Sequence, residues 1–479
     1  MYLGIDLGTS SVKIVLMNDA QDIIDTESSD CTVSRPHDSW SEQDPAQWID
    51  ATRNCLSALK QNHAAALASV RGIGLSGQQH GATLLGADDE VLRPCILWND
   101  TRATAEAETL NTPAIQQLCG SIVFPGFTAP KVLWVKENEP ELFKKCKTVL
   151  LPKDYLRLWL TGEKVSEMSD ASGTGWLDVA RRDWSDELMN TGDVTPEQMP
   201  SLVEGNQSSG TLRAAVAEEF GLPASAVVAG GAGDNAASAC GMGTVRPGSA
   251  FLSLGTSGVL FAANESYKPA PASAVHTFCH SVPDTWHQMG VILSATDSLN
   301  WLSGITGQKP STMVDAVGTT LQAPGSTTFL PYLGGERTPH NNAAMRGALA
   351  GIGHDCDAQA LTRAVLEGVS FAFRDNVAAL ALAGTNLDRV AAVGGGSRSR
   401  YWLQLLATVL NMPVDITVSG DFGAGFGAAR LGMMAADGSS VDSVCTTPET
   451  AETFEPAQAL VGEYNDAYER FRALYPKLS

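Results

Sequence analysis

The sequence predicts an α/β fold that contains more than one domain. Short β-type runs alternate with segments of helical periodicity along the whole chain, which is typical of α/β architecture. The 479 residues are more than one hydrophobic core usually organises, so about two to four domains are expected. A short motif near the N-terminus also returns near the middle of the chain, which suggests two related halves.

Strands are predicted where short apolar runs lead into glycine-rich turns. The first two strands, separated only by Gly8-Thr9-Ser10-Ser11, are expected to pair as a hairpin. The predicted strands are Tyr2–Leu7, Val12–Leu16, Val70–Leu75, Val227–Gly230 and Val390–Val393.

Helices are predicted where a capping residue precedes apolar positions three or four residues apart. Asp44 can cap such a helix, Pro45 suits its first turn, and Gln47 has the spacing of a capping box. The other predicted helices begin near Asn235, follow the cap Asp357, span Tyr401–Leu410 with a stop at Asn411, and span about Ala457–Leu474. The last of these could pack on either domain.

The repeated motif sets the predicted domain boundary. Leu7-Gly8-Thr9-Ser10-Ser11-Val12 resembles Leu254-Gly255-Thr256-Ser257-Gly258-Val259, and each copy lies between two apolar strand-like runs. So short a match can arise by chance, but the matching context favours a duplication. We therefore divide the chain into domains of residues 1–244 and 245–479.

The charge of the chain argues against two classes of partner. There are 32 basic and 53 acidic residues, which give a net charge of −21. Nucleic acid needs a surplus of Lys and Arg facing its phosphates, and an anionic membrane attracts basic segments. We expect neither as a partner and attribute the charge to solubility.

The cysteines and the N-terminus indicate a cytoplasmic protein. Nine cysteines are scattered without a C-x-x-C pair, which is typical of a reducing compartment. The N-terminus lacks the basic and apolar regions of a signal peptide. No apolar run approaches the roughly 20 residues of a membrane span.

The two Gly-Thr-Ser turns are candidate phosphate sites. Their backbone N–H groups and hydroxyls suit phosphate oxygens, and glycine permits close approach. One such turn is ordinary hairpin chemistry, but one in each half suggests two walls of a single site. The candidates are Thr9, Ser10, Gly255 and Thr256.

Asp6 closes the first strand and is a candidate magnesium ligand. Its carboxylate could hold Mg²⁺, directly or through a water, beside the phosphates of a nucleotide. Lys13, on the return strand, could reach the same phosphates. The alternatives are an ordinary edge-strand aspartate and a solvated lysine.

Two further glycine-rich loops follow predicted strands. The loop 229–233 ends at Asp234, which could act as a general base on a hydroxyl or could simply cap the next helix. The loop Gly394-Gly395-Gly396-Ser397 could admit an adenosine group against bare backbone. It does not fit G-x-G-x-x-G, and the chain has no Gly-Lys dipeptide, so a Rossmann fingerprint and a Walker A loop are both excluded.

Polar side chains after the strand Val70–Leu75 suit a polyol. Gln79 and His80 can each donate and accept hydrogen bonds, although a single histidine is often structural. Two other patterns receive no catalytic role. His276-x-x-Cys279-His280 lacks the second pair of a zinc site, and Glu336-Arg337 is expected to form an ion pair in a loop.

In this order and spacing, the motifs resemble those of the FGGY carbohydrate kinases, which share the core of actin, hexokinase and the chaperone ATPases. The resemblance covers nearly the whole chain. It includes one family signature over Gly126–Asn138 and a second over Gly347–Glu367 that departs from the pattern at Ala360. It implies two ribonuclease-H-like domains around a deep cleft, with the sugar mainly on the first domain and ATP mainly on the second.

Within the family, several stretches are similar to bacterial members that phosphorylate D-xylulose to D-xylulose 5-phosphate. Gln79 stands where many of these members have methionine. The stretches are Trp40–Pro45, Gly77–Gly81, Ile96–Asp100, Leu151–Tyr155 and Gly335–His340.

The resemblance also assigns roles to residues. Asp234 is the general base on the primary hydroxyl of the sugar, and Asp6 helps to hold Mg²⁺. Thr9, Ser10, Gly255 and Thr256 face the ATP phosphates, Gly395, Gly396 and Ser397 lie at the adenosine, and Gln79, His80, Asp234 and Asn235 line the sugar. A homodimer is common in the family, but no residue pattern indicates one here.

Three alternatives remain open. An FGGY kinase for ribulose, glycerol or gluconate would differ only in its sugar. An actin-like or chaperone-like ATPase would use the same core without a sugar, which the polar loops of the first half disfavour. A sugar-binding regulator without catalysis is disfavoured because Asp6 and Asp234 are both present.

Overall fold

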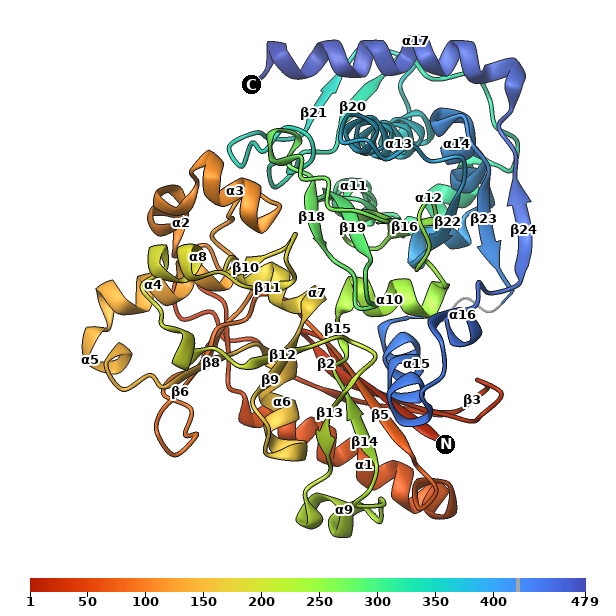
Figure 1. Cartoon of the computed structure of the whole chain (residues 1–479). Coiled ribbons are helices and arrows are strands. Elements are labelled where there is room, and N and C mark those ends of the chain that lie inside the picture. Colours follow the sequence, from red (N-terminus) through yellow and green to blue (C-terminus); the bar gives the residue numbers. More distant parts are fainter. Residues whose placement is uncertain (419–422) are drawn as a thin grey trace.

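The computed structural model describes residues 1–418 and 423–479. Figure 1 shows two halves, with the N-terminus in the first half and helix α17 (Gln458–Leu474) along the outside of the second. Each half is organised around a seven-stranded sheet. Helices such as α1 (Ala46–Leu67) and α13 (Ala358–Leu382) pack on these sheets. The predicted α/β class is therefore confirmed.

The first sheet has the order β13-β14-β5-β1-β2-β3, and β15 pairs with β5 outside this path. Its central strand β1 pairs antiparallel with β2 and parallel with β5. The strands are β1 (Tyr2–Leu7), β2 (Ser11–Met17), β3 (Ile23–Asp30), β5 (Gly72–Gly77), β13 (Ser208–Thr211), β14 (Val227–Ala229) and β15 (Ala232–Gly233).

The second sheet has the order β18-β19-β17-β16-β22-β23-β24. Its central strand β16 pairs antiparallel with β17 and parallel with β22. The strands are β16 (Ala250–Leu254), β17 (Gly258–Asn264), β18 (His276–Cys279), β19 (Trp286–Ile292), β22 (Val390–Val393), β23 (Val414–Thr417) and β24 (Thr450–Phe454).

The two sheets share one plan. On one side of the central hairpin each adds an antiparallel strand, β3 or β19. On the other side each adds two parallel strands, β5 and β14 or β22 and β23, and then an antiparallel strand, β13 or β24. In both halves the Gly-Thr-Ser turn joins the two strands of the central hairpin. This repetition confirms the internal repeat inferred from the sequence.

Helix α15 (Ala424–Asp437) comes from the second half of the chain but lies on strands β1 and β5 of the first sheet. A Cβ added to Gly74 would lie 1.7 Å from the carbonyl oxygen of Ala428, and one added to Gly4 would lie 1.8 Å from that of Gly425. Only glycine permits so close an approach of backbone to backbone. The division at residue 244 stays a prediction. Helix α15 follows this boundary in the sequence but packs on the sheet of the first half.

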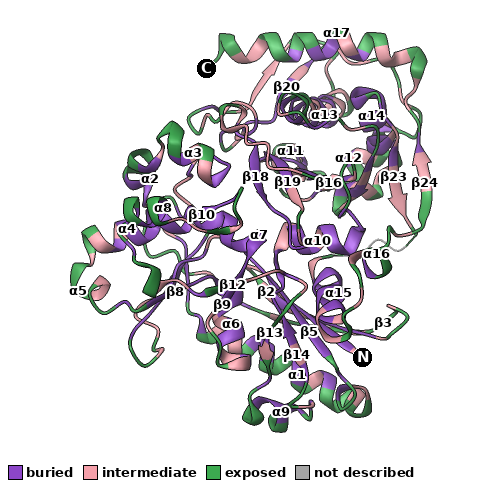
Figure 2. Cartoon of the chain, viewed as in Figure 1, coloured by how far each residue is buried: buried purple, intermediate pink, exposed green. Residues whose placement is uncertain are grey.

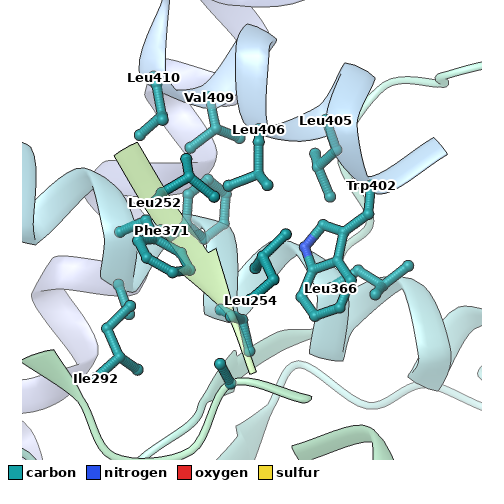
Figure 3. Close-up of a cluster of buried hydrophobic side chains, with 14 of the residues drawn as sticks. Leu252, Leu254, Ile292, Leu366, Phe371, Trp402, Leu405, Leu406, Val409 and Leu410 are labelled. Atoms are coloured by element: carbon teal, nitrogen blue, oxygen red, sulfur yellow. The ribbon is translucent and has the colours of Figure 1, made fainter. Parts of the chain in front are cut away.

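The core of the second half lies between β16 and the helices α13 and α14 (Arg400–Leu410). Figure 3 shows Leu252 and Leu254 of the strand against Phe371 of α13 and Trp402 of α14. In Figure 2 the central strands of both sheets are largely buried, whereas α17 keeps an exposed outer face. The central strands therefore lie within packed cores, and their ends carry most candidate site residues.

Most predicted helix boundaries hold, but the capping box is wrong. Asp357 caps α13 by accepting a hydrogen bond from the backbone N of Ala360 at 2.8 Å, and Asn411 ends α14 in the left-handed conformation. At α1 the N-cap is Pro45, and Gln47 Oε1 instead accepts a hydrogen bond from the backbone N of Thr32 at 2.9 Å. The side-chain amide of Gln47 therefore bonds to Thr32, which is distant in the sequence, and is not available to the start of the helix. The C-terminal helix α17 packs on α13 and α14.

The remaining helices that bear on the site are short. They are α4 (Thr128–Asn138), α6 (Pro152–Thr161), α7 (Met168–Ala171), α10 (Asp234–Met242), α11 (Thr296–Thr306) and α12 (Pro310–Val317). Within residues 1–418 and 423–479, no helix combines the length and the apolarity that crossing a membrane requires.

Candidate active site

Two aspartates lie at the same edge of the first sheet. β1 and β15 both pair in parallel with β5, and the register places Asp6 and Ala232 on either side of Ser76. Asp234 follows β15 directly as the first residue of α10. Because α/β folds bind ligands at the carboxyl ends of their parallel strands, the fold brings both predicted carboxylates into one site.

The environment of Asp234 suits a general base. Burial and the neighbouring charge of Asp6 raise the pKa of Asp234 to about 6. Asn235 opposes this shift, because its backbone N and its Nδ2 donate to Asp234 Oδ1 at 2.7 and 2.9 Å. The alternative of a helix cap does not apply, since the N-cap of α10 is Gly233. A carboxylate with such a pKa can accept a proton near neutral pH.

Asp6 presents an oxygen without a protein partner. Burial raises the pKa of Asp6, and the nearby Ser76 hydroxyl and Lys13 ammonium oppose the rise. Lys13 faces Asp6 across the β1–β2 hairpin. The buried Asp6 Oδ1 accepts no hydrogen bond from the part of the chain that the structure describes. A buried carboxylate oxygen left in this state fits a magnesium ion or a water bound to one.

Gln79 and His80 lie beside the strand end that carries Asp234. Gln79 Nε2 donates to the carbonyl oxygen of Ser169 at 3.2 Å. A Cβ added to Gly233 would lie 2.7 Å from the same Nε2 atom. Glycine at this position therefore lets the amide of Gln79 reach the loop in front of Asp234, as the sugar-site prediction requires.

His80 is fixed and neutral. Its Nδ1 lies 2.6 Å from the carbonyl oxygen of Gly173, and its ring stacks on Phe127 with centroids 4.5 Å apart. Burial lowers the pKa of His80 to about 3, and the charges of Lys131 and Arg337 contribute to the shift. Because a carbonyl oxygen only accepts, Nδ1 carries the proton, and Nε2 is left as an acceptor for a hydroxyl.

The first Gly-Thr-Ser turn is held by a network that the sequence did not reveal. Thr9 Oγ1 donates to Gln78 Oε1 and accepts from Trp98 Nε1, both at 3.0 Å. The hydroxyl of Thr9 is thus engaged within the protein, and its backbone amide remains as a candidate phosphate donor. Ser10 is exposed at the turn. Trp98 is 45% exposed, and neither its exposure nor its contact with Thr9 can be read from the sequence.

A cavity of about 720 Å³ opens in the second half beside the glycine-rich loop that begins at Gly394. Gly395 and Gly396 line it, and a Cβ added to Gly396 would lie 2.8 Å from the Cβ of Leu254. The other walls come from α11, α12 and α14, including Thr296, Asn300, Pro310, Val314, Tyr401 and Trp402. Its size and mixed lining suit a nucleoside.

Thr296 joins this cavity to the second Gly-Thr-Ser turn. Its backbone N and Oγ1 donate to the carbonyl oxygen of Gly255 at 2.9 and 2.8 Å. Thr256 is exposed at the same turn. Ser397 is not among the residues that line the cavity. Its Oγ donates to the carbonyl oxygen of Gly394 at 2.7 Å. The helices α11 and α12 were missed because their sequences look like ordinary surface helices.

The two patterns without an assigned role are structural in different ways. His276 Nδ1 lies 2.8 Å from Ser121 Oγ, and His280 Nε2 lies 3.1 Å from the carbonyl oxygen of Thr244. Among the described residues, no three His, Cys, Asp or Glu side chains gather as a metal-binding group. The predicted ion pair of Glu336 with Arg337 is wrong, because Glu336 Oε1 accepts from the backbone N of Arg337 rather than from its guanidinium.

The repeated sheets, with their hairpins and strand-end carboxylates, define the class of two-domain, ribonuclease-H-like ATPase folds. Residues 1–241 match the N-terminal domain of the FGGY family of carbohydrate kinases, and residues 250–436 match its C-terminal domain. The chain belongs to this family and is a carbohydrate kinase.

Relatives resemble the chain over its full length. It is 46% identical to a xylulose kinase from Escherichia coli (strain K12), over 100% of this chain and 99% of the relative. It is 59% identical to the solved structure of a xyloylose kinase from Brucella ovis, with a TM-score of 0.98 and coverage of 100% and 99% of the two chains. The solved xylulose kinase from Rhodospirillum rubrum is 31% identical, with a TM-score of 0.91 and coverage of 100% and 98%.

Proposed function

We propose that this chain transfers the γ-phosphoryl group of MgATP to O5 of D-xylulose. The observation that carries the chemistry is the half-buried Asp234 beside Asp6, because burial and the charge of Asp6 raise the pKa of Asp234 to about 6. The identity of the sugar is inferred from full-length relatives named xylulose kinase.

In the proposed reaction Asp234 removes the proton of the O5 hydroxyl as that oxygen attacks the γ-phosphorus atom. The bond from the γ-phosphorus to the bridging oxygen of ADP breaks, and its electrons leave with ADP. Asn235 keeps Asp234 Oδ1 oriented, so Oδ2 is the oxygen that faces the hydroxyl. Phosphoryl transfer depends mainly on positioning and on charge stabilisation.

The ligands divide between the halves in this proposal. Asp6, through its unpartnered Oδ1, would hold Mg²⁺ directly or through a water, and the ion would neutralise charge on the phosphates. Thr9, Ser10, Lys13, Gly255 and Thr256 would face those phosphates. Adenosine would occupy the cavity at Gly395 and Gly396, and Ser397 would act only by holding this turn. Gln79, His80 and Asn235 would line the sugar.

The direct test is an ADP-release assay across D-xylulose, ribulose, glycerol and gluconate. The proposal expects the highest kcat/KM with D-xylulose. A higher value with another of these sugars would replace xylulose but keep the kinase chemistry. ATP turnover that does not depend on any sugar would favour the actin-like or chaperone-like alternative.

A cytoplasmic location is part of the proposal. It is supported by nine free thiols, because thiols stay reduced in that compartment. Homodimer formation also stays a prediction, and the mass of the protein in solution tests it.

The activity is expected to fall at low pH. The base acts only as a carboxylate, and the pKa of Asp234 is raised to about 6 by burial and by Asp6. The value of kcat/KM should therefore be constant well above pH 6 and should fall about tenfold for each pH unit below it, because kcat/KM reports the ionisation of the free enzyme. A pH profile of kcat/KM for the sugar measures this, and a midpoint near pH 4 would contradict the raised pKa of the base.

His80→Ala is expected to weaken sugar binding while leaving ATP binding intact. The change removes the Nε2 acceptor and also the ring that stacks on Phe127. We expect KM for D-xylulose to rise about tenfold, the scale of one hydrogen bond left unmade, with KM for ATP within about twofold. His63→Ala is the matched control, because His63 pairs with Asp25 at the edge of the first sheet. An unchanged KM for every sugar would remove His80 from the site.

A further inference from the structure

Arg337 reaches from the second half of the chain to the first. It lies in the loop between β20 (Thr328–Leu330) and β21 (Ala348–Ala350). Its guanidinium carbon lies 4.3 Å from the centre of the Phe124 ring, and Phe124 belongs to the first half. Arg337 therefore contacts the other half of the chain through a cation–π interaction with Phe124. We call the rings of Phe124 and Phe127 the aromatic platform.

The aromatic platform leads from Arg337 to the candidate sugar site. The ring centroids of Phe124 and Phe127 lie 5.9 Å apart, and Phe127 stacks on His80 at 4.5 Å. Burial lowers the pKa of both His80 and His276, and the positive charge of Arg337 lowers the pKa of each further. Arg337 therefore lies on the His80 side of the site.

The guanidinium of Arg337 has donors to spare. It makes no hydrogen bond or ion pair with any residue in the ranges 1–418 and 423–479. Arg337 is half-buried, and burial lowers its pKa to about 10. The adjacent carboxylate of Glu336 does not pair with this guanidinium: its Oε1 accepts from the backbone N atoms of Leu293 and Arg337, and its buried Oε2 has no hydrogen-bond partner among the described residues. A half-buried guanidinium that makes no hydrogen bond within the described residues has its donors available to a ligand.

The loop that carries Arg337 is held in place on both sides. Thr338 Oγ1 donates to the carbonyl oxygen of Ala274 at 2.8 Å and accepts from the backbone N of Val291 at 3.1 Å. The backbone N of Glu336 donates to the carbonyl oxygen of Asn342 at 3.0 Å. The guanidinium is therefore presented from a fixed backbone, which is the arrangement of a binding residue rather than of a mobile surface arginine.

We propose that Arg337 donates a hydrogen bond to the C2 carbonyl oxygen of the ketose and so selects a ketose over a polyol. This inference rests on the proposed function. A pentulose can close a furanose ring only through O5, so the molecule that presents a free O5 hydroxyl to Asp234 is acyclic and has a free carbonyl. A carbonyl oxygen only accepts and a guanidinium only donates.

The two ends of the acyclic sugar match the two ends of the site. Asp234 would take the O5 end. Arg337 lies on the ring of Phe124, and the ring contacts continue from Phe124 through Phe127 to His80. The donor thus lies at the end of the site where the carbonyl of a sugar held at O5 would lie. Since Arg337 comes from the second half, the sugar would also tie the two halves together.

The test compares Arg337→Ala with the wild type on D-xylulose and on xylitol, the alcohol in which C2 is reduced. KM for D-xylulose should rise about 10- to 100-fold, the range of a charge-assisted hydrogen bond, with kcat within about threefold. The inhibition constant of xylitol against D-xylulose should change less than about threefold. Arg374→Ala is the matched control, because its guanidinium also lies on an aromatic ring, 4.2 Å from the centre of Tyr468, within the second half.

The outcomes separate the two proposals. A KM for D-xylulose within twofold of the wild type, or equal losses for D-xylulose and xylitol, would overturn the role of Arg337 and leave the proposed function standing. A wild type that does not phosphorylate D-xylulose would overturn the proposed function itself. Equal melting temperatures of Arg337→Ala and the wild type exclude misfolding as the cause of a change, and Arg337→Lys, which keeps the charge, should recover part of the lost affinity.

Discussion

Replacing Asp234 with asparagine is expected to lower kcat at least about 100-fold, the contribution of a positioned general base. Asparagine keeps the shape of the side chain and the Oδ1 atom that accepts from Asn235. It cannot take a proton from a hydroxyl at neutral pH. The ADP-release assay at saturating sugar and ATP measures the effect, and KM for ATP should stay within about twofold because the nucleotide cavity lies in the other half.

The same substitution is expected to leave the protein at least as stable as the wild type. Burial and Asp6 raise the pKa of Asp234 above its ordinary value, so the charged form is disfavoured in the folded state. Stability from this group is therefore lost as pH rises from its unfolded pKa, near 4, towards 6, and a neutral amide avoids that loss. A melting temperature at pH 7.5 equal to or above that of the wild type would fit this account.

Asp357→Asn is the matched control for Asp234→Asn. Asp357 also lies at the start of a helix, where it accepts a hydrogen bond from the backbone N of Ala360, and asparagine is an equally good cap. Its kcat should match the wild type. Near-normal turnover of Asp234→Asn would remove the aspartate from the mechanism.

The sequence predicted those parts of the fold that depend on local signals. Tyr2–Leu7 and Val390–Val393 form strands with the predicted bounds, because an apolar run followed by a glycine-rich turn has few other solutions. The two Gly-Thr-Ser turns were enough to infer a repeat, since each needs its own flanking strands. The sheet order behind them is a property of long-range pairing and was not available from either turn alone.

The sequence did not predict features that depend on distant contacts. Asp6 and Asp234 meet only because β1 and β15 share β5 as a neighbour, and nothing local indicates that register. The capping box failed because Gln47 finds a partner at Thr32. Arg337 was expected to pair with Glu336, but its guanidinium lies on Phe124, more than 200 residues away in the chain.

A cluster of buried charges lies behind the site and is fully removed from water. Lys153 Nζ lies 2.6 Å from Asp154 Oδ1, 3.3 Å from Asp170 Oδ2 and 3.7 Å from Glu167 Oε1. Glu167 accepts from the backbone N and the hydroxyl of Ser169. Ser169 Oγ in turn accepts from the backbone N of Gly233 at 3.1 Å. Arg157 also lies 3.7 Å from Asp154 Oδ1 with its side chain fully buried, so Lys153 and Arg157 together face these three carboxylates, and Glu167 holds the strand end in front of Asp234 through Ser169.

Lys153→Met is expected to lower the free energy of unfolding by about 3–5 kcal/mol, the loss typical of a buried ion group that loses one partner. The remaining carboxylates would keep their burial without the lysine that now favours their charged forms. Burial already raises the pKa of Glu167 and of Asp170, and without the lysine both rise further. Denaturant titration of the wild type and the variant measures the loss.

The pH dependence of this loss separates charge from packing. Because a raised carboxylate pKa makes stability fall as pH rises, the deficit of Lys153→Met should be larger at pH 8 than at pH 5, where protonation relieves the unpaired charges. A deficit that is equal at both pH values would indicate lost packing instead. Lys144→Met is the control, because Lys144 pairs with Glu141 on the surface with 68% and 82% of the two side chains exposed, and such pairs contribute little. The cluster thus links the stability of the first half to the position of its base, since the hydrogen bonds that run from Glu167 through Ser169 end at Gly233, immediately before Asp234.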